Sequence, residues 1–448
     1  MSKKNIYLVI SILLFLLILY VKPLGLSLRQ SVILASTAVV ILWWATNSVS
    51  KTVSSVIIVL VFFTFSGSST QTILKFPLSG NLILIAASYL IAHGIKVSGL
   101  ADRISRTIIS RYAKSGFLLA VLSFVLSFIL IFLIPQPFPR AIIMAALYSE
   151  FLNKQDISAR TKSVLLFSIF VAVTATSMAF INGDVIFNNA ALQFAGISLT
   201  WPEWAKYMLV PSIIISMLML GGFVFIFYDD IKVKRFCADK CAKESTGFTF
   251  LESRGAVIIS AIILLWATES LHGVNSIWVS VIGVLAMHIF GLIKIKDYKI
   301  IKPELLLFLT AAFSIGGVLN QEGIAEAIFE MLLPSARSDE MLIFFSILMV
   351  MALHVFLGSS MTTMSICMPV LMSSLPASVN PVVMMFTIYT AINIHYILPI
   401  HHVVIMIGEG EGLYDTSMTI RYGVFLTMLA VISVYAVLMP YWRFIGVL

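Results

Sequence analysis

Charged residues are scarce in this sequence. Asp, Glu, Lys and Arg together make up 11% of its 448 residues, whereas hydrophobic residues make up 60%. A soluble domain carries about 25% charged residues. The deficit predicts an all-α polytopic membrane protein in place of a soluble domain. The net charge of +8 does not indicate nucleic-acid binding, because the basic residues are divided among short loops and form no cluster.

Cysteine is rare as well, and the sequence contains no HExxH metal motif. Of the three cysteines, Cys237 and Cys241 lie in the longest polar loop with three residues between them. That spacing fits neither a redox CxxC pair nor a zinc site without further ligands. We interpret both as ordinary cytosolic thiols and expect neither a metal centre nor an organic cofactor.

The sequence also lacks a leader-peptide cleavage signal. Met1-Ser2-Lys3-Lys4 followed by apolar residues 7–21 has the start of a signal peptide, but no small-x-small site follows it. We therefore predict that residues 1–28 form a retained N-terminal transmembrane helix.

Long apolar runs are abundant. A transmembrane helix needs about 20 apolar residues. Runs of sufficient length predict eleven spans, at 5–22, 30–48, 52–67, 79–97, 163–181, 205–227, 255–271, 276–292, 304–320, 382–399 and 422–441. Two further regions, 116–152 and 341–375, each consist of a long apolar limb, a break and a short limb. The short limbs cannot cross the bilayer, so we predict two re-entrant hairpins.

The distribution of basic residues orients these spans. With the N-terminus in the cytoplasm, 22 Lys and Arg fall in cytoplasmic segments and six in outer segments, and Arg140 alone is left at membrane depth. Positive charge is enriched on the cytoplasmic side of membrane proteins. We therefore predict a multi-pass protein of the inner (plasma) membrane with a cytoplasmic N-terminus and an external C-terminus.

Short segments recur along the chain in the same order. Residues 99–102 and 132–133 recur at 323–326 and 356–357, 224 residues later, and Lys206-Tyr207 recurs as Arg421-Tyr422, 215 residues later. Five predicted crossings lie between the copies, so the copies have opposite orientation. Inverted repeats with broken helices are typical of secondary transporters.

This repeat predicts the domain organisation. The first inverted repeat is 29–228, with its hairpin at about 116–152 and a broken helix at about 163–197. A cytoplasmic linker follows at 229–254. The second inverted repeat is 255–448, with its hairpin at about 341–375 and a broken helix at about 382–412.

The first break, residues 135–140, carries the most unusual charge of the chain. Three prolines in five residues cannot continue a helix. A cation at membrane depth is usually functional, and the planar fork of Arg140 suits carboxylate, sulfate or phosphate. The alternatives are that Arg140 reaches the inner surface or pairs with Asp184 or Glu150.

The second break, residues 358–363, matches the first in the repeat. Gly358 permits a tight turn. Four hydroxyl residues follow it: Ser359, Ser360, Thr362 and Thr363. We predict that these hydroxyls bind the solute; the alternative is that they only cap the two half-helices.

The third break follows the helix predicted at 163–181 and contains Asn182-Gly183-Asp184, a turn signal in an apolar run. Asp184 could bind a cation, carry a proton or pair with Arg140. The candidate ion-coupling residues are Thr176, Asn182, Asp184 and Pro399.

The fourth break is its counterpart and contains Pro399, His401 and His402. Adjacent histidines on a helix point about 100° apart and do not easily share a metal ion. Near a solute they can donate hydrogen bonds or titrate, so we predict that His401 and His402 contact the substrate. The other histidines of the apolar helices are interpreted as packed and hydrogen-bonded: His93, His288, His354 and His395.

At these four breaks the chain resembles the divalent anion:sodium symporter family. Members have the same number of spans, two hairpins and two broken helices, usually as homodimers with mobile transport domains. Their hairpin tips carry Ser-Asn-Thr and their broken helices a Thr-Pro-Pro-like motif, which contribute to sodium sites and to a dicarboxylate, citrate or sulfate site. Here Ser359–Thr363 is similar to one tip, while Pro135-Gln136-Pro137 departs from the other, and His401-His402 stand where paired prolines would be. The departures suggest that a fixed positive charge replaces one bound cation.

We therefore expect a symporter of a small anion, a di- or tricarboxylate or an inorganic oxyanion, that works by an elevator-like alternating-access movement. Sodium or a proton is the expected coupling ion, and the lipid bilayer and a second copy of the chain are the expected partners. The alternative is a cation/proton antiporter that uses Asp184 and the histidines. An intramembrane enzyme with His401 or His402 as base is a remote third reading, since the chain has the repeat and lacks polar catalytic loops.

Overall fold

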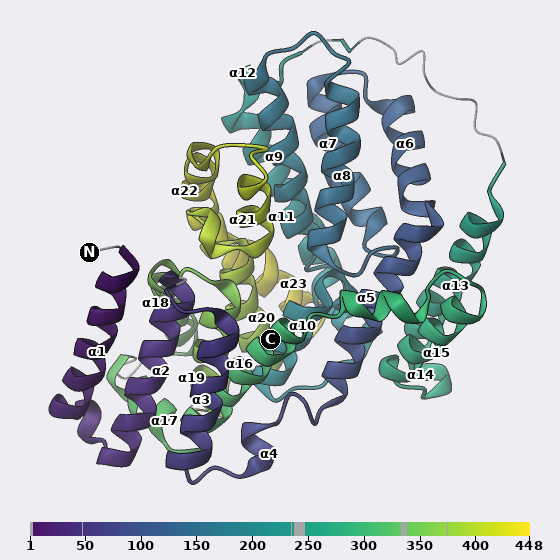
Figure 1. Cartoon of the computed structure of the whole chain (residues 1–448). Helices are drawn as coiled ribbons and strands as arrows, with labels where there is room; N and C mark the ends of the chain where they lie inside the picture. The colour runs from purple at the N-terminus through teal and green to yellow at the C-terminus, as the bar shows by residue number, and fades with distance from the viewer. Residues whose placement is uncertain (1–2, 47, 234, 237–246, 333–337, 374) are drawn as a thin grey trace.

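The computed structural model describes residues 3–46, 48–233, 235–236, 247–332, 338–373 and 375–448. Within these residues the fold is all-helical, without a strand, as the composition predicts (Figure 1). Seven helices of the described residues are long and apolar enough to cross a membrane, and shorter apolar helices accompany them. Cys237 and Cys241 lie outside the described residues.

The helices begin and end close to the predicted bounds. The first half contains α1 (Lys3–Val21), η1 (Pro23–Gly25), α2 (Leu28–Thr46), α3 (Lys51–Phe65), α4 (Thr70–Ile73), α5 (Gly80–Ser98), α6 (Leu100–Tyr112), α7 (Gly116–Leu130), α8 (Pro137–Leu152), α9 (Ala159–Thr176), η2 (Ile181–Asp184), α10 (Val185–Ala195), α11 (Trp201–Ile226) and α12 (Tyr228–Ile231). The second half contains α13 (Phe250–Ala267), α14 (Glu269–His272), α15 (Ser276–Ile289), η3 (Ile295–Ile300), α16 (Pro303–Gln321), α17 (Ile324–Leu332), α18 (Asp339–Leu357), α19 (Ser360–Ser373), α20 (Pro381–Ile394), η4 (Pro399–His401), α21 (Val403–Gly410), α22 (Thr416–Ile432), the π-helical η5 (Ser433–Leu438) and α23 (Met439–Phe444). Each of the eleven ranges predicted as spans overlaps one of these helices or, for the last, the run from α22 to α23. Six of the seven long apolar helices lie at predicted spans, the seventh is α18 of the predicted hairpin 341–375, and the number of spans stays a prediction.

One order of elements occurs twice. The series α5, α6, α7, α8, α9, η2, α10, α11 has the same form as α16, α17, α18, α19, α20, η4, α21, α22. The short helices α6 and α17 both follow a glycine with positive φ, Gly99 at 76° and Gly323 at 71°. Only glycine adopts this turn without strain, which accounts for the recurrence of Gly at the two positions. The opposite orientation of the copies stays a prediction.

The helices α1, α2 and α3 lie side by side and pack on the rest of the chain mainly through α16, with a smaller contact between α2 and α18 (Figure 1). Trp44 joins these elements, because its Nε1 donates to Ser54 Oγ at 2.8 Å and its ring meets Phe308 of α16 at a centroid distance of 4.8 Å. Glu322 at the end of α16 adds an ion pair of 3.0 Å with Arg29 of α2. These contacts build one packed face beside the second hairpin.

The predicted hairpin 116–152 is a helix, a break and a helix. Ser115 caps α7 by accepting from the N–H of Leu118, and Pro137 begins α8, where its missing N–H costs no helical hydrogen bond. Both α7 and α8 pack on α9. Hydroxyl pairs fix α7 to α9, at 2.8 Å between Ser123 and Ser168. The re-entrant placement of this hairpin in the bilayer stays a prediction.

The predicted hairpin 341–375 has the same construction. Helix α18 ends at Gly358, whose φ of 59° closes a left-handed cap, and α19 begins two residues later at Ser360. Both helices pack on α20, and α19 also packs on α16 and α10. The second hairpin therefore contacts its own broken helix and that of the first half.

The two broken helices meet at the centre of the molecule. Tyr389 of α20 donates to Oδ1 of Asn188 of α10 at 2.6 Å, and Asn393 donates to the carbonyl oxygen of Thr174 of α9 at 3.2 Å. In Figure 1, α10 and α20 lie between the first hairpin (α7, α8) and the second (α18, α19). The four predicted breaks are thus carried by elements that pack around one centre.

Candidate functional site

Arg140 is the fourth residue of α8 and is fully buried. Its Nη1 donates to the carbonyl oxygen of Ile134 at 3.1 Å, and its Nη2 donates to that of Gly183 at 3.2 Å. Its Nε–H has no acceptor. Among the described residues, Arg140 takes part in no ion pair within 4.0 Å, so neutral carbonyl groups hold this cation.

Two alternatives for Arg140 are wrong. A fully buried side chain does not reach the membrane surface. Glu150 pairs instead with Arg106 at 2.6 Å, at the opposite end of α8. Asp184 attracts the charge of Arg140 across the first break without forming an ion pair with it.

The first hairpin break and the first broken helix are joined through their backbones. Val185 N–H donates to the carbonyl oxygen of Pro135 at 3.4 Å, and Asn182 Nδ2 donates to that of Ile131 at 3.3 Å. Gln136 is buried here with its Nε2 amide lacking an acceptor. The first tip therefore contains two buried side chains, Gln136 and Arg140, with unpartnered N–H donors.

The candidate ion-coupling residues of the first half have partners within the protein. Asp184 caps α10, because its Oδ1 accepts from Phe187 N–H at 3.0 Å, and its side chain is partly exposed. Asn182 is buried and its Oδ1 accepts from Trp201 Nε1 at 3.0 Å. Thr176 is buried, donates to the carbonyl oxygen of Ala172 at 2.8 Å and shares a 2.7 Å hydrogen bond with Ser127.

The hydroxyls of the second tip differ in their partners. Ser360 Oγ donates to the carbonyl oxygen of His401 at 2.7 Å, and Thr363 Oγ1 donates to that of Ser359 at 2.9 Å. Ser359 Oγ accepts from the N–H of Thr362 at 3.4 Å. Thr362 Oγ1 is buried without a partner. Capping accounts for Ser359 and Thr363, while the Thr362 hydroxyl is left for another group.

The paired histidines follow Pro399 in η4, as predicted, and both are buried. His401 Nδ1 accepts from the N–H groups of Ile397 and Leu398 at 3.1 and 3.3 Å, and its Nε2 has no partner. His402 Nδ1 accepts from Val404 N–H at 3.3 Å and caps α21. Each ring is thus oriented by the backbone of the break.

Two further histidines, which the sequence places on separate apolar helices, lie beside His401. The His354 ring of α18 is 5.3 Å from the His401 ring and 5.5 Å from the His395 ring, measured between centroids. All three are buried. His354 is packed and hydrogen-bonded, as predicted, and His395 is packed, but neither stands alone, because both form a cluster with His401. The prediction of a packed side chain is wrong for His288, which is exposed.

The predicted site residues form two groups. Arg140, Thr176, Asn182 and Asp184 surround the first break, and Ser359, Ser360, Thr362, Thr363, Pro399, His401 and His402 surround the second. No hydrogen bond of the described residues joins the groups directly. Asn188 instead links the two broken helices, since it donates to the carbonyl oxygens of Ser177 and Phe180 at 3.1 and 3.0 Å and accepts from Tyr389 of α20. This role of Asn188 was not predicted from the sequence.

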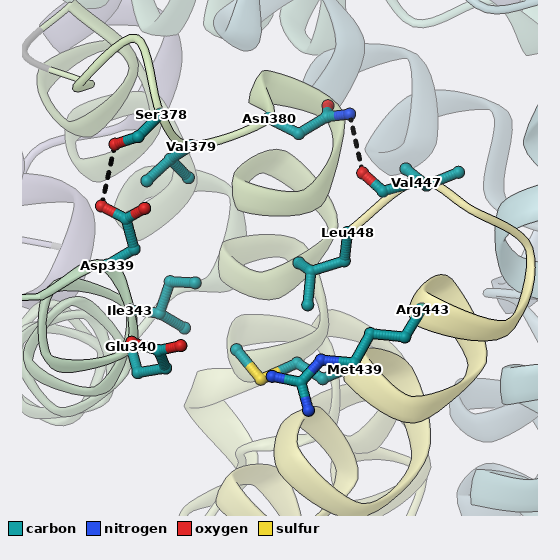
Figure 2. Close-up of a pocket in the computed structure, with 10 residues that line it drawn as sticks. All are labelled: Asp339, Glu340, Ile343, Ser378, Val379, Asn380, Met439, Arg443, Val447 and Leu448. Atoms are coloured by element: carbon teal, nitrogen blue, oxygen red, sulfur yellow. Dashed lines mark hydrogen bonds between the residues drawn. The ribbon is translucent and has the colours of Figure 1, made fainter.

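Two cavities lie outside these groups. One, of about 320 Å³, lies between the start of α18 and the C-terminal residues. Figure 2 shows its lining, in which Ser378 donates to Asp339 and Asn380 donates to the Val447 carbonyl oxygen. It contains none of the predicted site residues. The other, of about 400 Å³, reaches Ile181 of η2 and is also lined by Lys75, Asn81, Asn189, Gln193 and residues at the start of α15.

The arrangement of side chains can bind an anion more readily than a metal ion. Within the described ranges, His, Cys, Asp and Glu form no group of three suited to a metal ion. The first tip instead offers a cation and unpartnered N–H groups, which complement oxyanions.

The comparisons with known proteins agree with this fold. The sequence matches a family described as the sodium:sulfate symporter transmembrane region over residues 2–448. A protein of Cupriavidus necator, named only "Membrane protein", is 21% identical over 470 residues, and the alignment covers 95% of this chain and 90% of that protein.

The described residues are all-helical with apolar spans, and the family match covers nearly the whole chain. Together these findings identify a membrane transporter. The chain belongs to the sodium:sulfate symporter family. This membership confirms the resemblance inferred from the breaks.

Proposed function

We propose that this protein is a secondary active transporter of a small anion, either a di- or tricarboxylate or an inorganic oxyanion. The observation that carries the proposal is the fully buried Arg140, held by two carbonyl oxygens and paired with no carboxylate within 4.0 Å among the described residues. A buried charge without a counter-charge is costly. An anionic solute supplies that counter-charge, and the attraction to Arg140 holds the solute in the site.

The surroundings of Arg140 favour a solute with several oxygen atoms. The unpartnered N–H groups of Arg140 and Gln136 are buried at the same hairpin tip. Hydrogen bonds from such groups to a charged acceptor contribute about 1.5–3 kcal/mol each. A carboxylate, sulfate or phosphate presents enough acceptors for both donors, whereas a monatomic anion has no fixed geometry for the planar fork of arginine.

The cavity of about 400 Å³ supports an approach to this site. It touches Ile181, the first residue of the η2 segment that also carries Asp184, and Lys75 contributes its positive charge. None of the described residues that line the cavity is Asp or Glu. Such a lining favours the entry of an anion over that of a cation.

Alternating access is proposed to move the two hairpins and the two broken helices together. These elements contact one another through α9, α10 and α20, and Asn188 and Tyr389 lie at their centre. The helices α1–α3, α5 and α13–α16 would form the scaffold, through which two copies dimerise. The N-terminus is assigned to the cytoplasm and the C-terminus to the outside, and a sodium ion or a proton drives transport.

Uptake into proteoliposomes tests the proposal. Radiolabelled sulfate, succinate and citrate are offered in turn under an inward sodium gradient or an inward proton gradient. We expect uptake of at least one anion above protein-free liposomes under one of the gradients. Absence of uptake for all three, together with anion-independent sodium/proton exchange, would instead support the antiporter that Asp184 at the first break could serve.

A further inference from the structure

A cluster of three buried histidines joins the second hairpin to the second broken helix. His354 is on α18, four residues before the hairpin tip at Gly358. His395 directly follows α20, and His401 ends η4. The three rings are at most 1% exposed. Titratable side chains of this kind are seldom buried together without a role.

Hydrogen bonds assign the protons on two of the rings. His354 Nε2 lies 3.1 Å from the carbonyl oxygen of His401, which can only accept, so this nitrogen carries the proton. His354 Nδ1 therefore holds a free lone pair and has no partner. His401 Nδ1 accepts from two backbone N–H groups, so its proton is on Nε2. His395 Nδ1 is buried and unpartnered as well.

We propose that His354 and His395 form a proton-binding site whose occupation is coupled to anion binding at the hairpin tips. A proton from the aqueous phase binds an unpartnered ring nitrogen of His354 or His395 and adds one positive charge. The same proton is released to water on the other side of the membrane. The coupling part rests on the proposed anion transport, whereas proton binding by the pair does not.

The geometry connects this proton to the tip. His354 Nε2 also lies 3.3 Å from Ser360 Oγ, and both groups share the carbonyl oxygen of His401. Protonation at Nδ1 leaves these bonds in place and places a cation one hydrogen bond from the tip. A cation there favours a bound anion, and by linkage the bound anion favours protonation to the same degree.

The cluster accepts one proton and not several. A second imidazolium at a centroid distance of 5.5 Å would repel the first in a buried site. No carboxylate of the described residues forms an ion pair with His354, His395 or His401. One proton per transport cycle is therefore the expected stoichiometry.

Few other titratable groups lie next to the pair. The helices of the pair and the elements packed against them carry titratable side chains that include Arg29, Arg160, Lys162, Asp184, Glu304, Glu326, Asp339, Glu340, Cys367, Tyr389, Tyr396, His401, His402, Glu409, Arg421, Tyr422 and Tyr435. Of these, the described contacts bring only His401 into ring contact with His354. Histidine is the side chain that ordinarily titrates between about pH 5 and pH 8.

The first test measures proton binding without transport. The full chain is labelled with ¹⁵N-histidine, placed in nanodiscs, and titrated from about pH 8 to about pH 3 with NMR detection of ring nitrogens, because a buried imidazole binds a proton less readily than one in water. We expect the signals of His354 and His395 to titrate together as one proton per chain, and His354→Gln to shift the titration of His395. Signals that stay neutral throughout, or that titrate independently of each other, would overturn the proposal.

The second test measures coupling. Liposomes containing the protein and an internal pH dye receive an outer pulse of sulfate or succinate in sodium-free medium. We expect internal acidification with anion uptake, reduced at least about tenfold in His354→Gln and His395→Gln. His288→Gln, the same change on an exposed histidine of α15, should behave as wild type.

The outcomes separate this inference from the proposed function. Anion uptake by the wild type without proton movement overturns the coupling and leaves anion transport in place. A wild type that transports none of the anions removes the proposed function, and the titration in nanodiscs then decides by itself whether the pair binds a proton.

Discussion

The guanidinium of Arg140 donates a hydrogen bond of 3.2 Å to the carbonyl oxygen of Gly183. This bond joins the tip of the first hairpin to the break in the first broken helix. A movement of the hairpin alone would break this bond. The same bond aligns the remaining donors of Arg140, so the position of the Gly183 carbonyl group determines the geometry offered to a solute.

Gly183→Ala should destabilise the protein strongly. A Cβ atom at this position would collide with the carbonyl oxygen of Ser177, a backbone atom that cannot rotate away. We expect a loss of about 1–3 kcal/mol in the free energy of unfolding, measured by thermal unfolding in detergent. Gly221→Ala is the matched control, because nothing lies within 4 Å of its added Cβ. Equal stability of the two variants would contradict the described packing of the break.

Tyr389→Phe should also lower stability. The substitution removes the donor to Asn188 Oδ1 and leaves a buried acceptor without a partner between the two broken helices. We expect a cost of about 1–3 kcal/mol. Tyr441→Phe removes an exposed hydroxyl that donates to the Lys206 carbonyl oxygen, and should change stability by less than about 0.5 kcal/mol. A difference between the variants smaller than the error of chemical unfolding would argue against the bridge.

Thr176 allows a structural role to be separated from an ion-coupling role. Its hydroxyl bonds to the Ala172 carbonyl oxygen and to Ser127, so Thr176→Val should cost about 1 kcal/mol of stability. Thr64→Val on α3, where the hydroxyl is exposed, is the control. If Thr176→Ser restores stability and the dependence of uptake on sodium stays unchanged, Thr176 is a packing residue. A change in the sodium dependence at full stability would make it an ion ligand.

The ends of the helices could be predicted from the sequence because their causes are local. Apolar run length, Pro137 at the start of α8 and Gly358 at the end of α18 determine where the elements begin and end. Repeated Gly99 and Gly323 revealed the recurring order of elements for the same reason, since a positive φ at both positions requires glycine.

The partners of the buried polar groups could not be predicted, because they depend on backbone atoms brought together by the fold. Arg140 bonds to the carbonyl groups of Ile134 and Gly183, and a carbonyl group leaves no mark in a sequence. His354 and His401 are 47 residues apart, and only the packing of α18 on η4 brings them together. The histidines themselves can be found in the sequence, but which of them lie against one another cannot.

Anion binding by Arg140 is the central claim, and a thermal-shift titration of purified protein tests it most directly. Sulfate, succinate and citrate are titrated, each in sodium and in potassium, against wild type, Arg140→Gln, Arg140→Lys and Arg106→Gln. Arg106 of α6 is exposed, pairs with Glu150 near the far end of α8, and is the matched control.

We expect one of the anions to stabilise the wild type and Arg106→Gln equally. Arg140→Gln should weaken its binding by about 10- to 100-fold, as the loss of one or two charge-assisted hydrogen bonds requires, and Arg140→Lys should lie between them. Binding of the same anion by Arg140→Gln with the affinity of the wild type, in protein that remains folded, would contradict the account.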